Sequence, residues 1–300
     1  MLVVVTLLWG LSFPWMKEMQ DAAADCPGGK ALASLTLIAV RMPLAVLLLG
    51  LWRPGLFCRA TRRERRTGLW IGATFFAGFA LQVWGLAYTT PALSAFFTSL
   101  GSAWAPLIAW TFLGERVAFS PLFGLGVALA GTTVLVEGGW RLGVGEGLTF
   151  VASLIFAGQI LLLDRLGKGL RSEYLSPAFF TATATAAVVA AVLVALAGPG
   201  VRPWLEWTTR YLGQPRVVGN LGLLVVFSTV LSFHWMNVYQ PRVSASRAAL
   251  IYLLEPVFGA AFSVCSGHDQ ITNHLVLGGV LILAGNLLAE SPRWLNRRAN

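Results

Sequence analysis

Long apolar stretches fill most of this 300-residue chain and leave little polar sequence between them. A helix needs about 20 mostly apolar residues to cross the roughly 30 Å of hydrocarbon in a bilayer, because it rises about 1.5 Å per residue. Ten stretches meet this requirement: 2–20, 33–52, 68–88, 92–113, 118–137, 146–164, 174–197, 218–239, 243–265 and 272–290. The sequence therefore predicts an all-α membrane protein with ten transmembrane helices.

The composition argues against a water-soluble enzyme. Charged residues make up 12% of the chain, whereas soluble domains carry about 25%. The three cysteines, Cys26, Cys58 and Cys265, form neither a C-x-x-C pair nor a metal-ligand spacing. We expect no cofactor, no structural metal and no disulfide scaffold.

Basic residues predict the orientation in the membrane. The chain carries 22 Lys and Arg against 13 Asp and Glu, and basic residues that flank spans tend to stay in the cytoplasm. With the N-terminus inside, most of them fall on the inner side, including the run Arg59–Arg66. We expect a multi-pass protein of the plasma (inner) membrane with both termini cytoplasmic. The basic run is then expected to contact anionic lipid rather than nucleic acid.

Two further segments have a simple expected placement. The first span begins without a basic leader and shows no small-residue cleavage site, so it is expected to be a retained helix rather than a signal peptide. Residues 198–216 form the one sizeable predicted loop. Its Trp204, Trp207 and Tyr211 are expected to rest at the lipid headgroups.

The chain also repeats itself weakly. The pattern Gly114-Glu115, Gly124 and Ala130-Gly131 recurs as His268-Asp269, Gly278 and Ala284-Gly285 at a constant shift, and Pro106 matches Pro256 upstream. Two halves with an odd number of spans enter the membrane from opposite sides. We therefore predict two inverted five-helix repeats, residues 1–140 and 141–300, an architecture typical of alternating access.

Several short motifs resemble one transporter family. They are Trp9-Gly10-Leu11-Ser12-Phe13, Gly85-Leu86-Ala87-Tyr88-Thr89-Thr90-Pro91, Gly114-Glu115, and Ser246-Arg247-Ala248-Ala249-Leu250-Ile251 leading to Glu255-Pro256. Their order and spacing resemble the EamA family of the drug/metabolite transporter superfamily, although His268-Asp269 stands where Gly-Glu is usual. The resemblance implies a ten-helix exporter of small metabolites, with amino-acid exporters among the members. It also implies a cavity near the membrane midplane lined by spans 1, 3, 4, 6, 8 and 9.

Polar side chains inside the predicted spans are the first candidates for the cavity wall. Such groups are costly against lipid, so they turn toward the bundle interior or water. The candidates are Gln82, Gln159, His234 and Asn237. Their alternative role is hydrogen bonding or packing between helices. His234, the only histidine within a predicted span, is also a candidate protonatable group because its ordinary pKa is near neutral.

Glu255 is the second kind of candidate. It is expected near the middle of the ninth span, just before the helix-distorting Pro256. A carboxylate at that depth must be paired, hydrogen-bonded, protonated or hydrated. Proton coupling and a structural role both remain open, and Arg41 and Arg247 are the candidate partners.

Aromatic residues on the expected lining spans complete the candidate substrate-binding set. They are Trp9, Phe13, Phe97, Trp104, Phe156 and Tyr252. Aromatic walls accept apolar substrate bodies by stacking and attract cations through the ring face. The alternative for each ring is contact with lipid.

The function expected from the sequence is secondary export of amino acids, aromatic, threonine or methionine-like, or of related small metabolites. A multidrug or quaternary-cation exporter is the alternative in the same architecture, and a non-transporting membrane scaffold is the alternative in another class. The sequence contains no H-E-x-x-H, G-x-S-x-G or nucleotide-binding loop, so we do not expect an enzyme. The expected partners are a small-molecule substrate and the lipid bilayer, with proton coupling and a monomer or homodimer left open.

Overall fold

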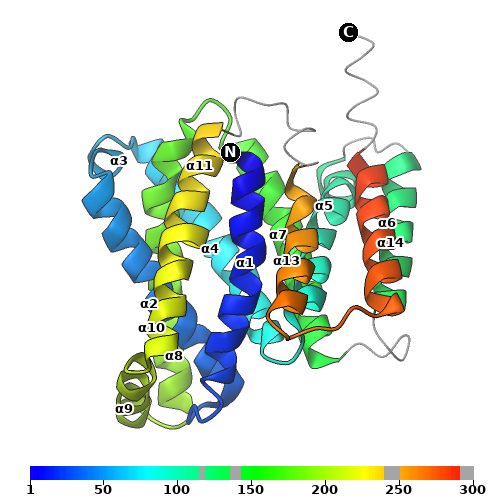
Figure 1. The fold of residues 1–300 in the computed structure, drawn as a ribbon. Helices are drawn as coiled ribbons and strands as arrows, with labels where there is room; N and C mark the ends of the chain where they lie inside the picture. The colour runs from blue at the N-terminus through cyan, green and yellow to red at the C-terminus, as the bar shows by residue number, and fades with distance from the viewer. Residues whose placement is uncertain (115–118, 136–142, 240–250, 291–300) are drawn as a thin grey trace.

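The computed structural model describes residues 1–114, 119–135, 143–239 and 251–290 (Figure 1). Every element of regular structure within these residues is helical. The helices that overlap the predicted spans are α1 (Leu2–Asp21), α2 (Gly29–Trp52), α4 (Arg62–Leu86), α5 (Pro91–Leu113), α6 (Phe119–Leu135), α7 (Val144–Leu166), α8 (Ser176–Ala197), α13 (Leu254–Cys265) and α14 (Asn273–Glu290). The short elements are α3 (Gly55–Cys58), η1 (Ser172–Leu175) and α9 (Val201–Leu212).

One further span is composite. It runs as α10 (Pro215–Leu223), then η2 (Leu224–Leu231), which is a π-helix, and then α11 (Ser232–Tyr239). A π-helical segment of this kind is rare and occurs mostly at functional positions inside α-helices.

Helices cover all ten apolar stretches of the sequence, within the residues described. Seven helical segments are long and apolar enough to cross a bilayer, namely α1, α2, α4, α5, α7, the η1–α8 segment and the composite α10–η2–α11. The apolar parts of α6, α13 and α14 are shorter. The all-helical membrane fold predicted from the sequence is therefore confirmed, while the number of complete crossings stays a prediction.

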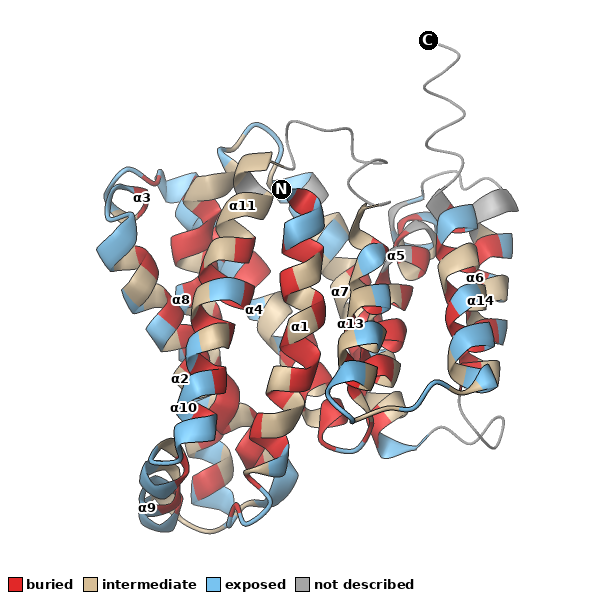
Figure 2. Ribbon diagram, in the orientation of Figure 1, coloured by how far each residue is buried: buried red, intermediate tan, exposed pale blue. Residues whose placement is uncertain are grey.

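The outer surface of the bundle is apolar. Large hydrophobic side chains point outward from several helices, for example Leu47 of α2, Leu193 of α8 and Val280 of α14, each exposed by more than half. Figure 2 shows exposed and buried residues alternating along these helices, with the buried ones turned toward the neighbouring helices. A soluble protein does not expose apolar surface on this scale. This surface suits contact with lipid.

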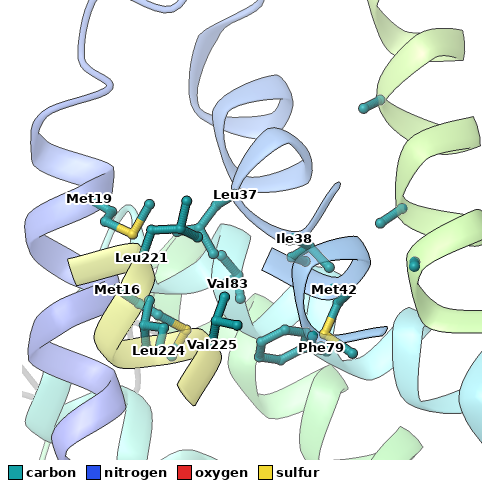
Figure 3. Packing of buried hydrophobic residues seen from close by; sticks show 14 of the residues in the cluster. Met16, Met19, Leu37, Ile38, Met42, Phe79, Val83, Leu221, Leu224 and Val225 are labelled. Carbon is teal, nitrogen blue, oxygen red and sulfur yellow. The ribbon is translucent and has the colours of Figure 1, made fainter. Parts of the chain in front are cut away.

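The main hydrophobic core lies between α1, α2, α4, α8 and the composite span. Met16 of α1, Ile38 and Met42 of α2, Phe79 of α4 and Val225 of η2 converge there (Figure 3). A second cluster joins α5, α6 and α14. The helices of the second cluster stand to one side of the bundle in Figure 1.

Two glycine contacts hold α6 against α14. A Cβ atom added at Gly124 would lie 2.5 Å from the carbonyl oxygen of Gly285, and one added at Gly131 would lie 2.9 Å from that of Gly278. These are the four glycines that the sequence repeat matches, Gly124 with Gly278 and Gly131 with Gly285. The contact is reciprocal, because each helix uses its first glycine against the other's second. Reciprocal contacts of this kind are the signature of a two-fold axis.

Residues 198–216 differ from the loop that we predicted. They contain the helix α9, which lies at the end of the bundle opposite the start of α1 (Figure 1). Trp204, Trp207 and Tyr211 are buried against protein, so their predicted place at the headgroups is wrong. The amphipathic pattern of α9 faces α1 and α2 rather than lipid.

Each of the three buried rings makes a specific polar contact. The indole nitrogen of Trp204 donates to Thr36 at 2.8 Å, and that of Trp207 donates to Asp25 at 2.9 Å. The hydroxyl of Tyr211 donates to the carbonyl oxygen of Met19 at 2.9 Å. Burial raises the pKa of the Tyr211 phenol, which keeps it protonated as a donor.

The glycine contact between α6 and α14 leads to the first prediction. Gly124→Ala places a methyl group against the backbone of α14, which cannot give way like a flexible side chain. Overpacking of this kind costs about 1–3 kcal/mol, so the apparent melting temperature of the purified protein should fall. Gly126→Ala is the matched control, since an added Cβ there meets nothing within 4 Å. Equal melting temperatures for the two variants would contradict the packing described.

Candidate functional site

Aromatic rings from six segments of the chain meet inside the bundle. We call this set the aromatic cluster; its members are Trp9, Phe75, Phe79, Phe156, Phe179, Phe180, Phe233 and Tyr252. Phe75 of α4 is central: its ring centroid lies 4.9 Å from that of Phe179 in α8 and 5.9 Å from that of Phe156 in α7. The cluster thus joins α4 to two helices of the other half of the chain.

Phe233 and Trp9 extend the cluster toward α13. The ring of Phe233 in α11 lies 6.0 Å from that of Phe75 and 5.6 Å from that of Trp9 in α1. The ring centroid of Trp9 lies 5.6 Å from that of Tyr252, which stands two residues before the start of α13. Trp9, Phe233 and Tyr252 are only partly buried. A wall of partly exposed ring faces suits an apolar or cationic substrate body.

Glu255 lies next to this end of the cluster. The helix α13 begins at Leu254, one residue after the helical residues 251–252, and Glu255 occupies its first turn. The predicted place of Glu255 near the middle of the ninth span stays a prediction, because residues 243–250 of that span lie outside the described part of the chain. Pro256 falls in the same turn, where a missing N–H removes no hydrogen bond within α13. A carboxylate in the first turn of a helix is stabilised by the helix dipole.

The predicted ionic partners of Glu255 are not found at its side. Arg41 contacts the composite span instead, through Ser228 and Thr229, and Arg247 lies outside the described residues. Among the residues that the structure describes, no ion pair involves Glu255. Its carboxylate interacts electrostatically with the phenol of Tyr252.

The polar candidates are distributed over several places. Gln82 is buried, and its Nε2 atom donates to Thr98 of α5 at 2.9 Å, a hydrogen bond between helices. Gln159 is half-buried on α7. The ring of His234 lies 4.9 Å from that of Trp52 at the end of α2, and so it faces α2. The side chain of Asn237 lies outside the described part of the structure.

The remaining aromatic candidates lie outside the aromatic cluster. Phe97 is fully buried in the second hydrophobic cluster, and Trp104 packs edge-on against Phe150 at 5.6 Å. Phe13 is buried in the main core and lies close to Gly259 of α13. Of the six predicted rings, the structure brings Trp9, Phe156 and Tyr252 into one cluster.

Sequence reasoning did not single out the other five rings of the cluster, nor did it give Arg41 a binding role. Phe75 and Phe79 are one helical turn apart, a spacing that places both on one face of α4. That signal is weak in a chain with 18 phenylalanines. The sequence gives a stronger signal for Arg41, since an arginine within an apolar span is by default a functional candidate.

Known proteins resemble this chain in sequence and in fold. A probable terminal-alkyne amino-acid exporter of Streptantibioticus cattleyicolor is 23% identical, over 83% of this chain and 89% of that protein. An S-adenosylmethionine/S-adenosylhomocysteine transporter of Chlamydia trachomatis serovar L2 is 26% identical, over 85% of this chain and 77% of that protein. One crystal structure shares the fold with a TM-score of 0.58 at 18% identity, over 99% of this chain and 98% of the other.

The family model of the EamA-like transporter family matches twice, over residues 1–137 and over residues 143–290. These two segments cover nearly the whole chain and confirm the resemblance seen in the sequence motifs. Together with the apolar helices, they indicate a multi-pass membrane protein. The chain therefore belongs to the EamA-like transporter family.

Proposed function

We propose that the protein is a secondary transporter that exports amino acids, aromatic, threonine or methionine-like, or related small metabolites by alternating access. The observation that carries the proposal is the aromatic cluster, which joins α1, α4, α7, α8 and α11 and ends beside Glu255. Partly exposed rings and one carboxylate suit a substrate with an apolar body and an ammonium group. The relative named as an amino-acid exporter supports this substrate class.

The proposed architecture is ten spans in two inverted repeats, residues 1–140 and 141–300. Three observations support it: the two separate family matches, the reciprocal glycine contacts of α6 with α14, and the way equivalent helices pair. α1 of the first half packs on α13 of the second half. In the same way α7, the equivalent of α1, packs on α5, the equivalent of α13. Inverted repeats allow the two halves to exchange packings, which is the basis of alternating access.

The proposed orientation has both termini in the cytoplasm of a plasma (inner) membrane. α1 begins and α14 ends at the same end of the bundle (Figure 1). An ion pair lies at the start of α4, where Arg171 Nε donates to Glu64 at 2.8 Å and Thr61 caps the helix. The basic run Arg59–Arg66 lies at this start of α4, as expected for a cytoplasmic face.

In the proposed site, the rings of Trp9, Phe233 and Tyr252 receive the apolar part of the substrate. Phe156 supports Phe75 from α7. Glu255 accepts either the substrate ammonium group or a coupled proton. The other predicted residues make none of the ring contacts that define the aromatic cluster, and the side chain of Asn237 lies outside the described part of the structure. These residues stay predictions: Phe13, Gln82, Phe97, Trp104, Gln159, His234 and Asn237.

A flux assay tests the function directly. Proteoliposomes that contain the protein should move radiolabelled phenylalanine, methionine or threonine faster than empty liposomes. Trp9→Ala should raise the KM for phenylalanine about tenfold, because one lost ring contact costs about 1–2 kcal/mol. Trp70→Ala is the matched control, since Trp70 is mostly exposed on the outer face of α4. No flux of any amino acid or metabolite by folded protein would overturn the proposal.

A cation exporter is the second candidate. It is favoured by the aromatic cluster together with a carboxylate that has no ion pair among the described residues, an arrangement that suits a cation. The relative named as an S-adenosylmethionine transporter is consistent with it. Counterflow with a quaternary ammonium compound separates the candidates: uptake of the cation without uptake of any amino acid favours this second function.

Glu255→Gln distinguishes coupling from a structural role. The change removes the charge and keeps the size, so we expect uptake driven by a proton gradient to fall at least tenfold while exchange of labelled for unlabelled substrate continues. Glu206→Gln is the matched control, because Glu206 is exposed on α9 and pairs only with Arg202 among described residues. Unchanged gradient-driven uptake would assign Glu255 to helix structure.

A further inference from the structure

Arg41 is the most deeply buried cation in the described part of the chain. It lies in the middle of α2 with 4% of its surface exposed. Its neighbours along the helix are apolar, among them Ile38 and Met42, which pack in the core with Met16 and Phe79 (Figure 3). A guanidinium group stays charged in proteins, so a full positive charge is held inside an apolar span.

Among the described residues, the hydrogen-bond partners of Arg41 are all neutral. Its Nε atom donates to the hydroxyl oxygen of Thr229 at 2.8 Å, and one terminal nitrogen donates to that of Ser228 at 3.1 Å. The other terminal nitrogen contacts the sulfur of Met16 at 3.4 Å, a weak acceptor. Within residues 1–114, 119–135, 143–239 and 251–290, no carboxylate lies within ion-pair distance of this guanidinium.

Helix packing alone does not require this charge. Thr229 donates its own proton to the carbonyl oxygen of Leu224 at 2.8 Å, so it can only accept from Arg41. Hydrogen bonds to these hydroxyl oxygens need only a neutral donor, which would avoid the cost of burying an unpaired charge. The charge is explained if an anion joins the site, because a planar guanidinium is suited to a carboxylate in a two-point contact.

The segment that Arg41 contacts is the π-helix. Ser228 and Thr229 both belong to η2, the part of the composite span that departs from α-helical geometry. Such segments are frequent at functional sites. In the described residues, the Ser228 hydroxyl accepts a bond from Arg41 and donates none, so its proton is free for a second acceptor. The guanidinium of Arg41 and the hydroxyl of Ser228 can therefore both donate hydrogen bonds to one bound group.

Arg41 also borders the aromatic cluster. Its guanidinium carbon lies 5.3 Å from the ring centroid of Phe79, which stacks on Phe75 at 5.1 Å. From Phe75 the rings continue through Phe233 and Trp9 to Tyr252, which interacts with Glu255. The cluster thus connects a buried cation at one edge with a carboxylate at the other.

We propose that Arg41, with Ser228, binds the carboxylate of a zwitterionic substrate during transport, replacing the weak contact to the Met16 sulfur. The proposal rests on the proposed amino-acid export and narrows its substrate class to molecules with a free carboxylate. The ring faces of the aromatic cluster then receive the apolar side chain of the substrate. Glu255 takes no part in this contact, because the carboxylate and the ammonium group of an α-amino acid share one carbon atom. A purely cationic substrate would leave the Arg41 charge without a partner and is disfavoured.

A double-mutant-type cycle tests this assignment, in which one charged group is removed from the ligand and the guanidinium group is removed from the protein. Binding of L-phenylalanine, of phenethylamine, which lacks the carboxylate, and of 3-phenylpropionate, which lacks the ammonium group, is measured by thermal stabilisation of the purified full chain. Wild-type protein should bind phenylalanine at least tenfold more tightly than phenethylamine. Arg41→Gln should lose that preference, so the two deletions are not additive.

Two further variants keep the test decisive. Arg41→Lys retains the charge without the planar fork and should recover part of the preference. Arg202→Gln, at an exposed arginine of α9, should leave all three affinities unchanged. Should Arg41→Gln fail to fold, the wild-type ligand comparison still decides, since equal affinity for phenylalanine and phenethylamine overturns the proposal.

The outcomes separate this inference from the proposed function. If amino acids are transported but the effects on binding of removing the ligand carboxylate and of Arg41→Gln are additive, the role of Arg41 is overturned and the exporter function stands. Arg41-dependent binding of 3-phenylpropionate without amino-acid flux supports the carboxylate site and overturns amino-acid export. If there is neither amino-acid flux nor Arg41-dependent binding of a carboxylate, both the carboxylate site and the exporter function are overturned.

Discussion

Backbone contact at glycines is the interaction on which the rest of this bundle depends. Lipid provides no hydrophobic force to drive apolar helices together, so helices in a membrane associate where small residues let their backbones approach. Gly124 and Gly131 of α6 meet Gly285 and Gly278 of α14 in reciprocal fashion. The same principle brings Gly10 of α1 against α13, where an added Cβ would lie 2.7 Å from that of Phe258. These contacts set helix positions, and the aromatic cluster fills the space that remains.

The frame repeats, but the charges inside it do not. At the shift that matches Pro106 with Pro256, the position equivalent to Glu255 is Ala105. The helix equivalent to α2 is α8, which contains no charged residue, so Arg41 has no counterpart either. In the proposed inverted repeat, a symmetric scaffold gives two conformations of similar energy.

The sequence predicted the helices well because the thickness of a membrane fixes their length and composition. It failed where structure depends on partners far away in the chain. Trp207 is buried because it reaches Asp25, and nothing in residues 198–216 indicates that partner. The π-helix of η2 is likewise invisible to hydropathy. Three of the six predicted rings share one cluster. The other five members of the cluster could not be predicted, because the apolar residues of these helices are spread too evenly around the helix axis to show which face turns inward.

The two ends of the bundle carry different polar contacts, and this difference bears on the proposed cycle. At the α9 end, Glu18 of α1 accepts bonds from Arg216 at 3.0 Å and from Asn220 at 2.8 Å, joining the first half to the second. At the other end, Arg171 joins the second half to Glu64, a buried carboxylate. Opening either end requires its own cross-half contacts to separate while the others persist. Because both ends hold charged pairs rather than apolar surface alone, water that enters an opening gate can solvate the released groups, which lowers the cost of the transition.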